Sequence, residues 1–467
     1  MTCLNHASLA ASLAALTVAA DAAAASKPKS PAGKRPAVIV IMTDQQTAGA
    51  ISCAGNPWVR TPAMDALAAD GVRFTRAYCP YPLSGPCRAA LVTGRMPFEV
   101  GAFDNAIRPA DADMQAGIGQ RPAEAGYECL YAGKWHVPEV NLPDSGTGFR
   151  RISKMNDPAL ADACDAALKE YDGQKPLFLV ASLLNPHEIC EYGRHETLQY
   201  GELAPFSTEE CPNLPANFMP STYAAEALTL EHASSPRYHD TYTYTQDDWR
   251  RYLYAYYRLV ERADREVGRI VGVLKAHGLY DDAAIVFLSD HGDGAAAHGW
   301  NQKWNLQEEV INVPLIVKPP KGAGLRGVRN DEALSNVGLD LYATVCDYAG
   351  VTPDLERYRG RSLRPVAEGR QATLHDEVFV ETLLPGPDMR GWSVVGPRYK
   401  YVLYQWGRNR EALYDLQDDP GEMVNLAVDR RYEAELNRLR RAMYDWGVRI
   451  GDPKLVRNLR PFAETRN

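Results

Sequence analysis

The sequence lacks several features that would assign it to common classes of protein. Its 467 residues contain no Cys-x-x-Cys pair, which argues against a zinc ribbon or a thioredoxin-type redox motif. Positive charge is not in excess. Because the formal net charge is −8, sequence-independent binding of nucleic acid through a basic face is not expected. Any anion that the protein binds must therefore be held by a local cluster of positive groups.

The composition is otherwise that of an ordinary globular protein, with 45% hydrophobic and 24% charged residues. A chain of this length can bury a large core, and one large domain with a smaller one is the natural expectation. Nine cysteines are present. In an oxidising compartment some of them could pair, and buried unpaired thiols are the equally open alternative.

The N-terminal segment predicts export. Residues 7–25 are rich in Ala, Leu and Val, contain no Lys or Arg, and end in small residues suited to cleavage near Ala25. We therefore predict a signal peptide over 1–25, a linker over 26–35, and a periplasmic or secreted protein. The abundance of Ala and the charge of Asp21 disfavour a stable membrane span. A retained anchor and a disordered tail are the alternatives.

The next part of the chain predicts an α/β fold. Residues 37–43, 177–183 and 283–289 are short, uninterrupted, apolar runs, as expected for strands that are covered on both faces of a parallel sheet. Residues 249–277 form the clearest amphipathic helical pattern, which Gly278 ends. We predict a large, doubly wound, mostly parallel sheet flanked by helices over residues 36–350.

The pattern changes after about residue 350. Residues 377–381 and 392–405 are typical of short strands, the second interrupted by a Gly396-Pro397 turn, and residues 431–449 predict a charged amphipathic helix. We predict a smaller C-terminal α+β subdomain over 351–467, with an antiparallel sheet.

Two of the apolar runs end in polar residues. Asp44-Gln45 follows the first run, and Asp290-His291-Gly292-Asp293 follows the third. Ligands of open α/β sheets bind beyond the carboxyl ends of the strands, so these side chains are expected to converge on a hard divalent cation. The alternative is that each Asp caps the turn or helix that follows it.

The segment Ser84-Gly85-Pro86-Cys87-Arg88, which runs on to Thr93-Gly94-Arg95, resembles the signature of the formylglycine-dependent sulfatases. That signature is Cys or Ser, any residue, Pro, a small residue and Arg. Cys87 stands where Ser, Thr or Ala is commoner. Ser84 would also cap a helix that starts near Pro86, and a helix N-terminus there would help to bind an anion.

Further segments match the same family in the same order along residues 36–426. Gly133-Lys134-Trp135-His136 is similar to its Gly-Lys-x-His element, and Asn185-Pro186-His187 to its Pro-His element. His298 and Lys303 lie where the family has its second sulfate-binding cation. The segment 413–426 resembles its closing motif, which is structural.

The resemblance implies a complete set of site residues. The implied catalytic residues are Ser84, Arg88, Lys134, His136, His187 and Lys303. The implied metal ligands are Asp44, Gln45, Asp290, His291 and Ser84 after its oxidation to formylglycine (3-oxoalanine). The metal is expected to be Ca²⁺, with Mg²⁺ or Mn²⁺ as alternatives. His298 and Asn105 are expected to bind substrate, although Asn105 fits a turn equally well.

The resemblance also implies roles and partners. His187 would protonate the departing alcohol with help from Lys303 or His298, and His136 would take a proton from the aldehyde hydrate. Because position 84 is Ser, the partner in maturation would be a Ser-oxidising sulfatase-maturating enzyme. Export and a polar, Tyr- and Pro-rich segment over 188–248 favour a sulfated carbohydrate substrate. The alternatives are a phosphate or phosphonate ester hydrolase of the same superfamily, and an unmatured, inactive glycan-binding relative.

Overall fold

The structure is a computed structural model that describes residues 35–106, 109–137, 146–234, 241, 243–353 and 356–464. The predicted signal peptide and all but the last residue of the predicted linker lie outside the described residues. Within the described part of the chain, no helix has both the length and the apolar character needed to cross a membrane.

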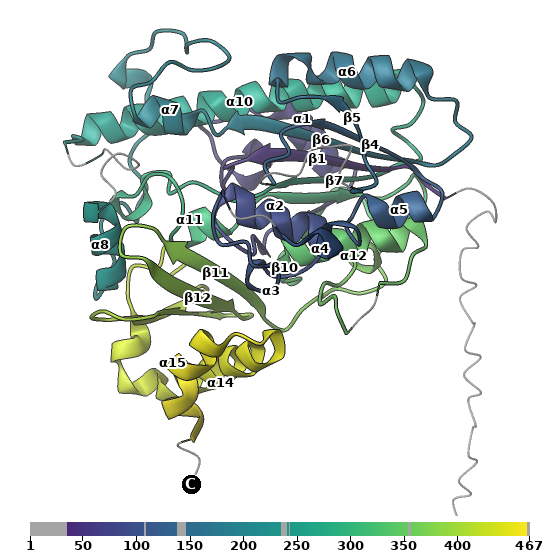
Figure 1. Cartoon of the computed structure of the whole chain (residues 1–467). Helices are drawn as coiled ribbons and strands as arrows, with labels where there is room; N and C mark the ends of the chain where they lie inside the picture. Colours follow the sequence, from purple (N-terminus) through teal and green to yellow (C-terminus); the bar gives the residue numbers. More distant parts are fainter. Residues whose placement is uncertain are drawn as a thin grey trace, which may run out of the picture. The chain divides into compact units, whose positions relative to one another are not determined.

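An eight-stranded sheet forms the centre of the α/β region (Figure 1). Its order is β5-β4-β6-β1-β7-β8-β2-β9, and every neighbouring pair is parallel except the two that β8 makes. The three predicted strands are confirmed as its adjacent central strands β6, β1 and β7. The strands are β1 (Val38–Asp44), β2 (Val72–Phe74), β4 (Glu128–Gly133), β5 (Arg150–Ser153), β6 (Leu177–Pro186), β7 (Ala284–Ser289), β8 (Leu315–Lys318) and β9 (Val328–Asn330).

The central strands are buried on both faces, which explains their unbroken apolar sequence. Alternate side chains of β1 enter two different cores, with Ile39 and Ile41 on one side and Val40 and Met42 on the other. The first core is covered by α1 (Pro62–Ala69), α6 (Asp157–Glu170) and α10 (Gln246–Ala276), and the second by α2 (Ser84–Thr93) and α12 (Val337–Ala349). Figure 1 shows these helices on opposite faces of the sheet.

The predicted amphipathic helix is confirmed as α10, and it begins three residues earlier than the apolar pattern indicated. The cause is a capping box, in which the Thr245 hydroxyl accepts from the Asp248 backbone N–H while the Asp248 carboxylate accepts from the Thr245 N–H.

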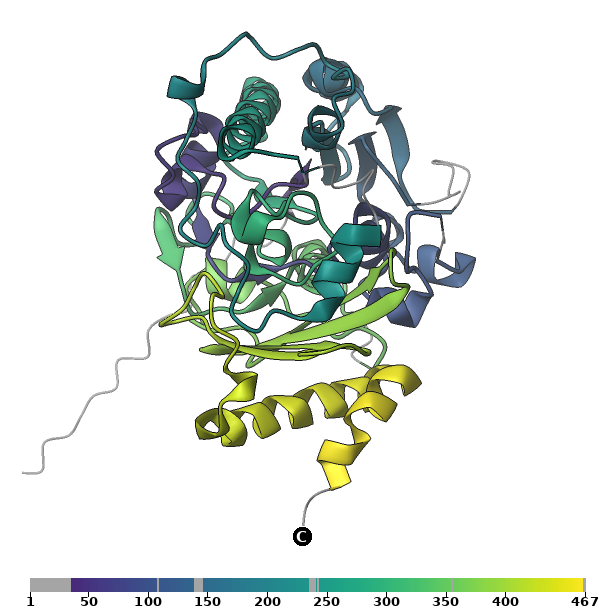
Figure 2. The same ribbon diagram turned by 90° about the vertical axis from the view of Figure 1, so that its left-hand side faces the viewer.

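The C-terminal residues form a four-stranded antiparallel sheet in the order β11-β12-β13-β14. The predicted strand interrupted at Gly396-Pro397 is the β12–β13 hairpin. Two helices cover one face of this sheet, as Figure 2 shows for the yellow segments. Residues 35–467 cluster as one compact unit, so the domain border predicted at 350 stays a prediction. The elements are β11 (Val378–Leu384), β12 (Met389–Val395), β13 (Tyr399–Tyr404), β14 (Glu411–Asp415), α14 (Glu433–Ile450) and α15 (Pro453–Glu464).

Short elements connect these layers, and two of them pair as a separate small parallel sheet, β3 (Ala77–Tyr78) with β10 (Ser335–Asn336). All eight cysteines in the described part of the chain are free. The short helices are α3 (Pro97–Val100), α4 (Asp111–Met114), α5 (Gln120–Glu124), α7 (Ile189–Gly193), α8 (Glu226–Ser234), α11 (Glu308–Ile311) and α13 (Arg364–Ala367).

Candidate active site

The two predicted acidic strand ends lie side by side. Strands β1 and β7 pair in parallel up to Thr43 and Ser289, so Asp44 and Asp290 follow at the same edge of the sheet. Both carboxylates are completely buried. Together with His291 they offer ligand atoms that all lie within 4.8 Å of one another. We call Asp44, Asp290 and His291 the strand-end cluster.

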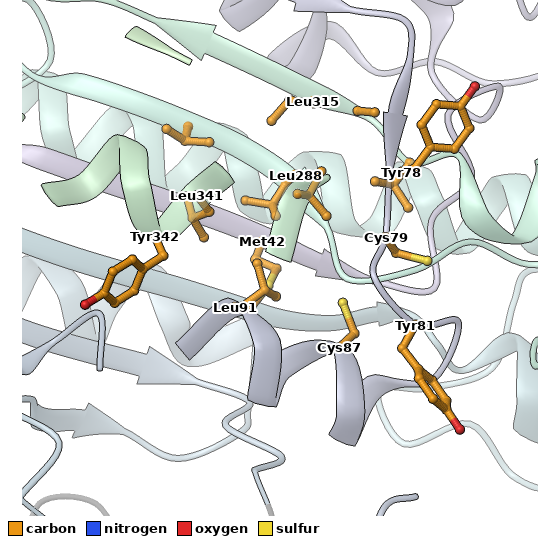
Figure 3. Packing of buried hydrophobic residues seen from close by; sticks show 14 of the residues in the cluster. Met42, Tyr78, Cys79, Tyr81, Cys87, Leu91, Leu288, Leu315, Leu341 and Tyr342 are labelled. Carbon is orange, nitrogen blue, oxygen red and sulfur yellow. The ribbon is translucent and has the colours of Figure 1, made fainter. Parts of the chain in front are cut away.

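Ser84 begins α2 and points into this cluster. Its Oγ lies 3.2 Å from Asp44 Oδ2 and 3.0 Å from His291 Nε2. Further along α2, the Cys87 thiol donates to the backbone carbonyl of Asp290 over 2.7 Å, which fixes the helix against the strand end. Figure 3 shows Cys87 and Leu91 of α2 facing Met42 of β1.

The structure explains why the signature has a glycine in its Thr93-Gly94-Arg95 tail. Gly94 ends α2 in the left-handed region with φ 67°, where a side chain would be strained. A Cβ at this position would also lie 2.6 Å from the Tyr342 ring of α12. Gly94 therefore lets α2 and α12 approach closely, and the close approach sets the position of Ser84 over the sheet.

Arg88 neutralises both acidic strand ends. Its Nη2 lies 2.9 Å from Asp44 Oδ2, and its Nε lies 2.8 Å from Asp290 Oδ2. The guanidinium also donates to the Lys134 carbonyl and to the Ser182 hydroxyl, so each of its nitrogens is bonded in a fully buried setting. A buried charge is stable only with such partners, and Arg88 thereby holds the two strand ends at a fixed separation.

His291 is held in one tautomer. Its Nδ1 lies 2.9 Å from the Gly292 carbonyl, so Nδ1 carries the hydrogen and Nε2 presents a lone pair to Ser84. Burial, and then the charge of Lys303, lowers the pKa of His291 to about 3. The neutral imidazole is the form that binds a metal. Gly292 has no side chain because a Cβ there would lie 2.1 Å from the Glu309 carbonyl.

Lys134 follows β4 and pairs directly with Asp44, over 2.6 Å between Nζ and Oδ2. Burial, and then Arg88 among the positive neighbours, lowers the pKa of Lys134 although Asp44 opposes the shift. Burial acts to raise the pKa of Asp44, but Lys134, then His187 and Arg88, outweigh it and hold the pKa well below its usual value. Asp44 is therefore ionised.

His136 and His187 lie in the loops after β4 and β6, and both are half-buried. Burial, and then Lys134, lowers the pKa of His136 to about 3. Burial, then Lys303 and Lys134, lowers the pKa of His187 well below its usual value. The structure thus places both imidazoles within the electrostatic reach of the cluster. In the free protein both are neutral.

Gln45 and Lys303 also join the site. The Gln45 amide nitrogen donates to Asp293 Oδ2 over 2.7 Å, and its amide oxygen accepts from Lys303 Nζ over 2.7 Å. Asp293 is in turn held by the Tyr252 hydroxyl at 3.0 Å. Asp293 is not among the site residues predicted from the sequence. The signal was its place in the Asp-His-Gly-Asp run.

Cys190 is a second contact that was not predicted from the sequence. Its thiol lies 3.2 Å from the amide oxygen of Gln45 and 3.0 Å from that of Gln302. Burial raises the pKa of the Cys190 thiol, so it stays protonated and acts as a weak donor. No spacing or motif in the sequence pointed to this contact.

The two predicted substrate-binding residues have different surroundings. Asn105 lies beside the start of α2, where its side-chain oxygen accepts from the Gly85 backbone N–H over 2.9 Å. His298 is not brought to the strand-end cluster. One of its ring nitrogens instead lies within 4.8 Å of a carboxylate oxygen of Glu309 and of one of Glu422. A role for His298 in binding substrate stays a prediction, but the structure places the side chain in a separate cluster.

The strand-end cluster fits a divalent cation. Burial, and then the neighbouring Asp44 carboxylate, raises the pKa of Asp290 to about 6, so the paired carboxylates repel each other where a cation would stabilise both. Two carboxylates and a neutral imidazole, with the Ser84 hydroxyl 3.2 Å from Asp44, form a donor set rich in oxygen. The Gln45 amide oxygen faces Lys303 and Cys190 instead. Donor sets rich in oxygen suit Ca²⁺, Mg²⁺ and Mn²⁺.

Comparison with known proteins agrees with this fold. The sulfatase family model matches residues 36–351, and a model described as the C-terminal part of N-sulphoglucosamine sulphohydrolase matches residues 296–448. Two Bacteroides thetaiotaomicron proteins are similar along nearly their whole length. Delta 4,5-hexuronate-2-O-sulfatase is 29% identical, covering 93% of both chains, and N-acetylglucosamine-6-O-sulfatase is 25% identical, covering 93% of this chain and 89% of the other.

A solved structure of a 2-O glycosaminoglycan sulfatase superposes with a TM-score of 0.78 at 28% identity, covering 90% of this chain and 93% of the other. The fold and the site therefore define a sulfuric ester hydrolase of the alkaline phosphatase-like type. The chain belongs to the sulfatase family.

Proposed function

We propose that this sulfatase hydrolyses a sulfate monoester of a carbohydrate, using a formylglycine formed from Ser84 and a divalent cation, Ca²⁺ in the first instance. The observation that carries the proposal is the position of Ser84. Its Oγ lies between the Asp44 carboxylate and the lone pair of His291, at the start of a buried helix. An ordinary capping serine would have no reason to contact two candidate metal ligands.

Formylglycine would supply a hydrated aldehyde as nucleophile, and the cation would supply Lewis-acid stabilisation of negative charge. Asp44, Gln45, Asp290 and His291, with residue 84 itself, would hold the cation. Arg88 fixes the separation of the two carboxylates. Lys134 and Lys303 provide positive charge in a buried site, where electrostatic stabilisation of a transition state is strongest.

His187 and His136 would move the protons. The low pKa of His187 comes from burial and from Lys303 and Lys134, so a bound sulfate group, by offsetting these cations, would raise it. His187 would then gain a proton only when substrate is present and could pass it to the departing alcohol. His136, neutral beside Lys134, is suited to accept a proton from the hydroxyl of residue 84.

The substrate proposal rests on the similar proteins named above, which act on sulfated sugars of the glycosaminoglycan type. We propose the same class here, with 2-O-sulfated unsaturated uronides as the first compounds to test. The experiment is a panel of 2-O- and 6-O-sulfated saccharides, an aryl sulfate, and the matching phosphate esters, tested on the matured enzyme. Turnover of a sulfated saccharide above all phosphate esters supports the proposal, and preference for the phosphate esters contradicts it.

Two cellular proposals accompany this function. The N-terminal segment leads us to propose a periplasmic or secreted location, which fractionation of cells that express the full chain would test. Because position 84 is Ser, we propose a Ser-oxidising maturase as partner. Co-expression with such an enzyme should yield active protein, whereas expression without it should yield folded, inactive protein.

A further inference from the structure

A second buried group of ionisable side chains lies outside the strand-end cluster. His298 lies in a short 3₁₀ turn (Ala297–Gly299), Glu309 in α11, and Glu422 in the segment after β14. Their ligand atoms all lie within 4.8 Å of one another. We call these three residues the histidine–glutamate cluster. Figure 1 shows α11 between the large sheet and the C-terminal sheet.

Neither ring nitrogen of His298 has a partner that meets hydrogen-bond geometry within the described residues, although the side chain is only 8% exposed. The Met219 backbone nevertheless interacts with the ring and favours its protonated form. Its backbone has a left-handed φ of 56°, and its N–H donates to the Asn217 carbonyl over 2.6 Å. Burial, and then Lys400, lowers the pKa of His298 to about 4. The ring is therefore neutral and buried, and one of its nitrogens lies within 4.8 Å of a carboxylate oxygen of Glu309 and of Glu422. A buried polar group without a partner is costly, and a missing ligand is one common cause.

The charges around His298 are not balanced. Glu308, Glu309 and Glu422 provide three carboxylates. Lys400 of β13 pairs with two of them, 3.0 Å from Glu308 and 2.5 Å from Glu422. Glu309 has one oxygen bonded to Asn217 and one without a hydrogen bond. The three carboxylates thus outnumber the one ammonium that contacts two of them within the described residues.

We propose that His298, Glu309 and Glu422 form a second metal site, which binds a divalent transition-metal ion of the zinc type. One imidazole nitrogen and two carboxylate oxygens are ligands that Zn²⁺ accepts, whereas Ca²⁺ prefers oxygen alone. The ion would supply the missing positive charge. Each carboxylate oxygen has two lone pairs, so Glu422 can bind the ion and keep its contact with Lys400.

A cavity adjoins one of the three proposed ligands. Its volume is about 630 Å³, and it is lined by Glu309 itself and by Ala297, Glu308 and Pro420, which are close in the chain to the proposed ligands. Two of the ligands belong to the α/β region and the third follows the C-terminal sheet. The bound ion would therefore tie the closing segment of the chain to the catalytic region.

The decisive test uses crystals of the full mature protein soaked in zinc chloride. Anomalous difference maps recorded on both sides of the zinc absorption edge should show zinc between His298 and Glu309, in addition to any metal at the strand-end cluster. Maps with zinc only at the strand-end cluster, or with none, would overturn the proposal. This measurement needs no variant, so it remains decisive if a variant fails to fold.

Calorimetric titration with Zn²⁺ provides a second test of the proposed site. The native chain should bind one more equivalent than Glu309→Gln or His298→Ala, and Glu332→Gln, an exposed glutamate, should match the native chain. Equal stoichiometry in the native chain and both cluster variants would contradict the proposal, as would an additional Ca²⁺ equivalent that these variants lose.

Discussion

The strand-end cluster and the histidine–glutamate cluster both combine two carboxylates with one neutral imidazole, and they differ in how the imidazole is held. In the first, His291 donates from Nδ1 to the Gly292 carbonyl and presents Nε2 to Ser84. In the second, neither nitrogen of His298 has a partner that meets hydrogen-bond geometry within the described residues. The first imidazole is oriented before any ligand arrives, whereas the second depends on a ligand for its orientation.

The two clusters also differ in their cations. Arg88 and Lys134 contact the strand-end carboxylates directly, and Arg88 contacts both of them. In the histidine–glutamate cluster, Lys400 pairs with Glu308 and Glu422. Within the described residues, no ion pair joins Lys400 to Glu309. The comparison teaches that a preorganised reactive site needs fixed positive charge, while a structural metal site can leave charge to be supplied by the ion. The following predictions test this contrast, from the largest effect to the smallest.

Replacing Ser84 by Ala should abolish turnover, with a loss on the order of 10⁴-fold or more, because the variant has no precursor of the nucleophile. Steady-state kinetics on an aryl sulfate after identical co-expression with the maturase would measure it. Thermal unfolding should still be cooperative. An active Ser84→Ala variant would remove residue 84 from the chemistry.

Arg88→Ala should destabilise the fold by about 3–5 kcal/mol, because Asp44 and Asp290 would keep buried charges without their shared partner. Denaturant unfolding in the presence of a chelator measures this effect without interference from metal. Arg329→Ala is the matched control, since the Arg329–Asp331 pair is exposed and its loss should change little. Equal effects in the two variants would contradict the role given to Arg88.

His187→Ala should lower kcat by about 10²- to 10⁴-fold for a sugar sulfate and much less for an activated aryl sulfate, because a phenolate departs without a proton. His136→Ala should lower kcat for both substrates, since its proton is removed from the hydroxyl of residue 84. Parallel kinetics of both variants on both substrates separate the two roles. If His187→Ala loses the same factor on both substrates, it is not the acid.

Asp293→Asn should weaken metal binding at the strand-end cluster by about 10- to 100-fold, because Asp293 orients the Gln45 amide through its nitrogen. Titration of the metal-free protein with Ca²⁺ measures the affinity directly. Asp281→Asn, at an exposed pair with Lys321, is the control and should leave the affinity unchanged. An unchanged Ca²⁺ affinity in Asp293→Asn would show that Gln45 needs no such orientation.

Glu422→Gln should have the smallest effect, and its sign depends on pH. The pKa of Glu422 is raised to about 8, so the folded protein binds more protons than the unfolded chain between its ordinary value and pH 8. The native chain therefore loses stability as the pH rises through this window, and the variant should not. In chelator, Glu422→Gln should gain stability over the native chain as the pH rises to 8. Excess zinc should reverse the gain, and a gain that zinc leaves unchanged would argue against the second site.

Much of the fold was predictable because its central strands have a simple pattern. The runs that became β1, β6 and β7 are apolar throughout, since both of their faces are covered. Shorter strands such as β8 (Leu315–Lys318) and the last helix α15 were not predicted. The first is too short to show a period, and the second follows a break at Gly451, whose φ is 71°.

The positions of site residues could be predicted for residues that directly follow strands, but not for residues that follow turns. Asp44 and Asp290 could be placed together because parallel strands end at one edge. His298 lies close to Lys303 in sequence, but Ala295, Ala296, His298 and Gln302 all have positive φ, and these turns send His298 to another cluster. The Tyr252–Asp293 contact joins α10 to the segment after β7, and no local pattern specifies such a distant partner.

The central claim is that Ser84 becomes the reactive group of this sulfatase. The most direct measurement is mass spectrometry of the peptide that contains Ser84, from preparations matured to different extents, each also assayed on a sulfated saccharide. The account predicts a peptide lighter than the serine form by two hydrogen atoms, and activity proportional to the fraction in that form. Full activity from protein whose residue 84 is entirely unmodified serine would contradict it.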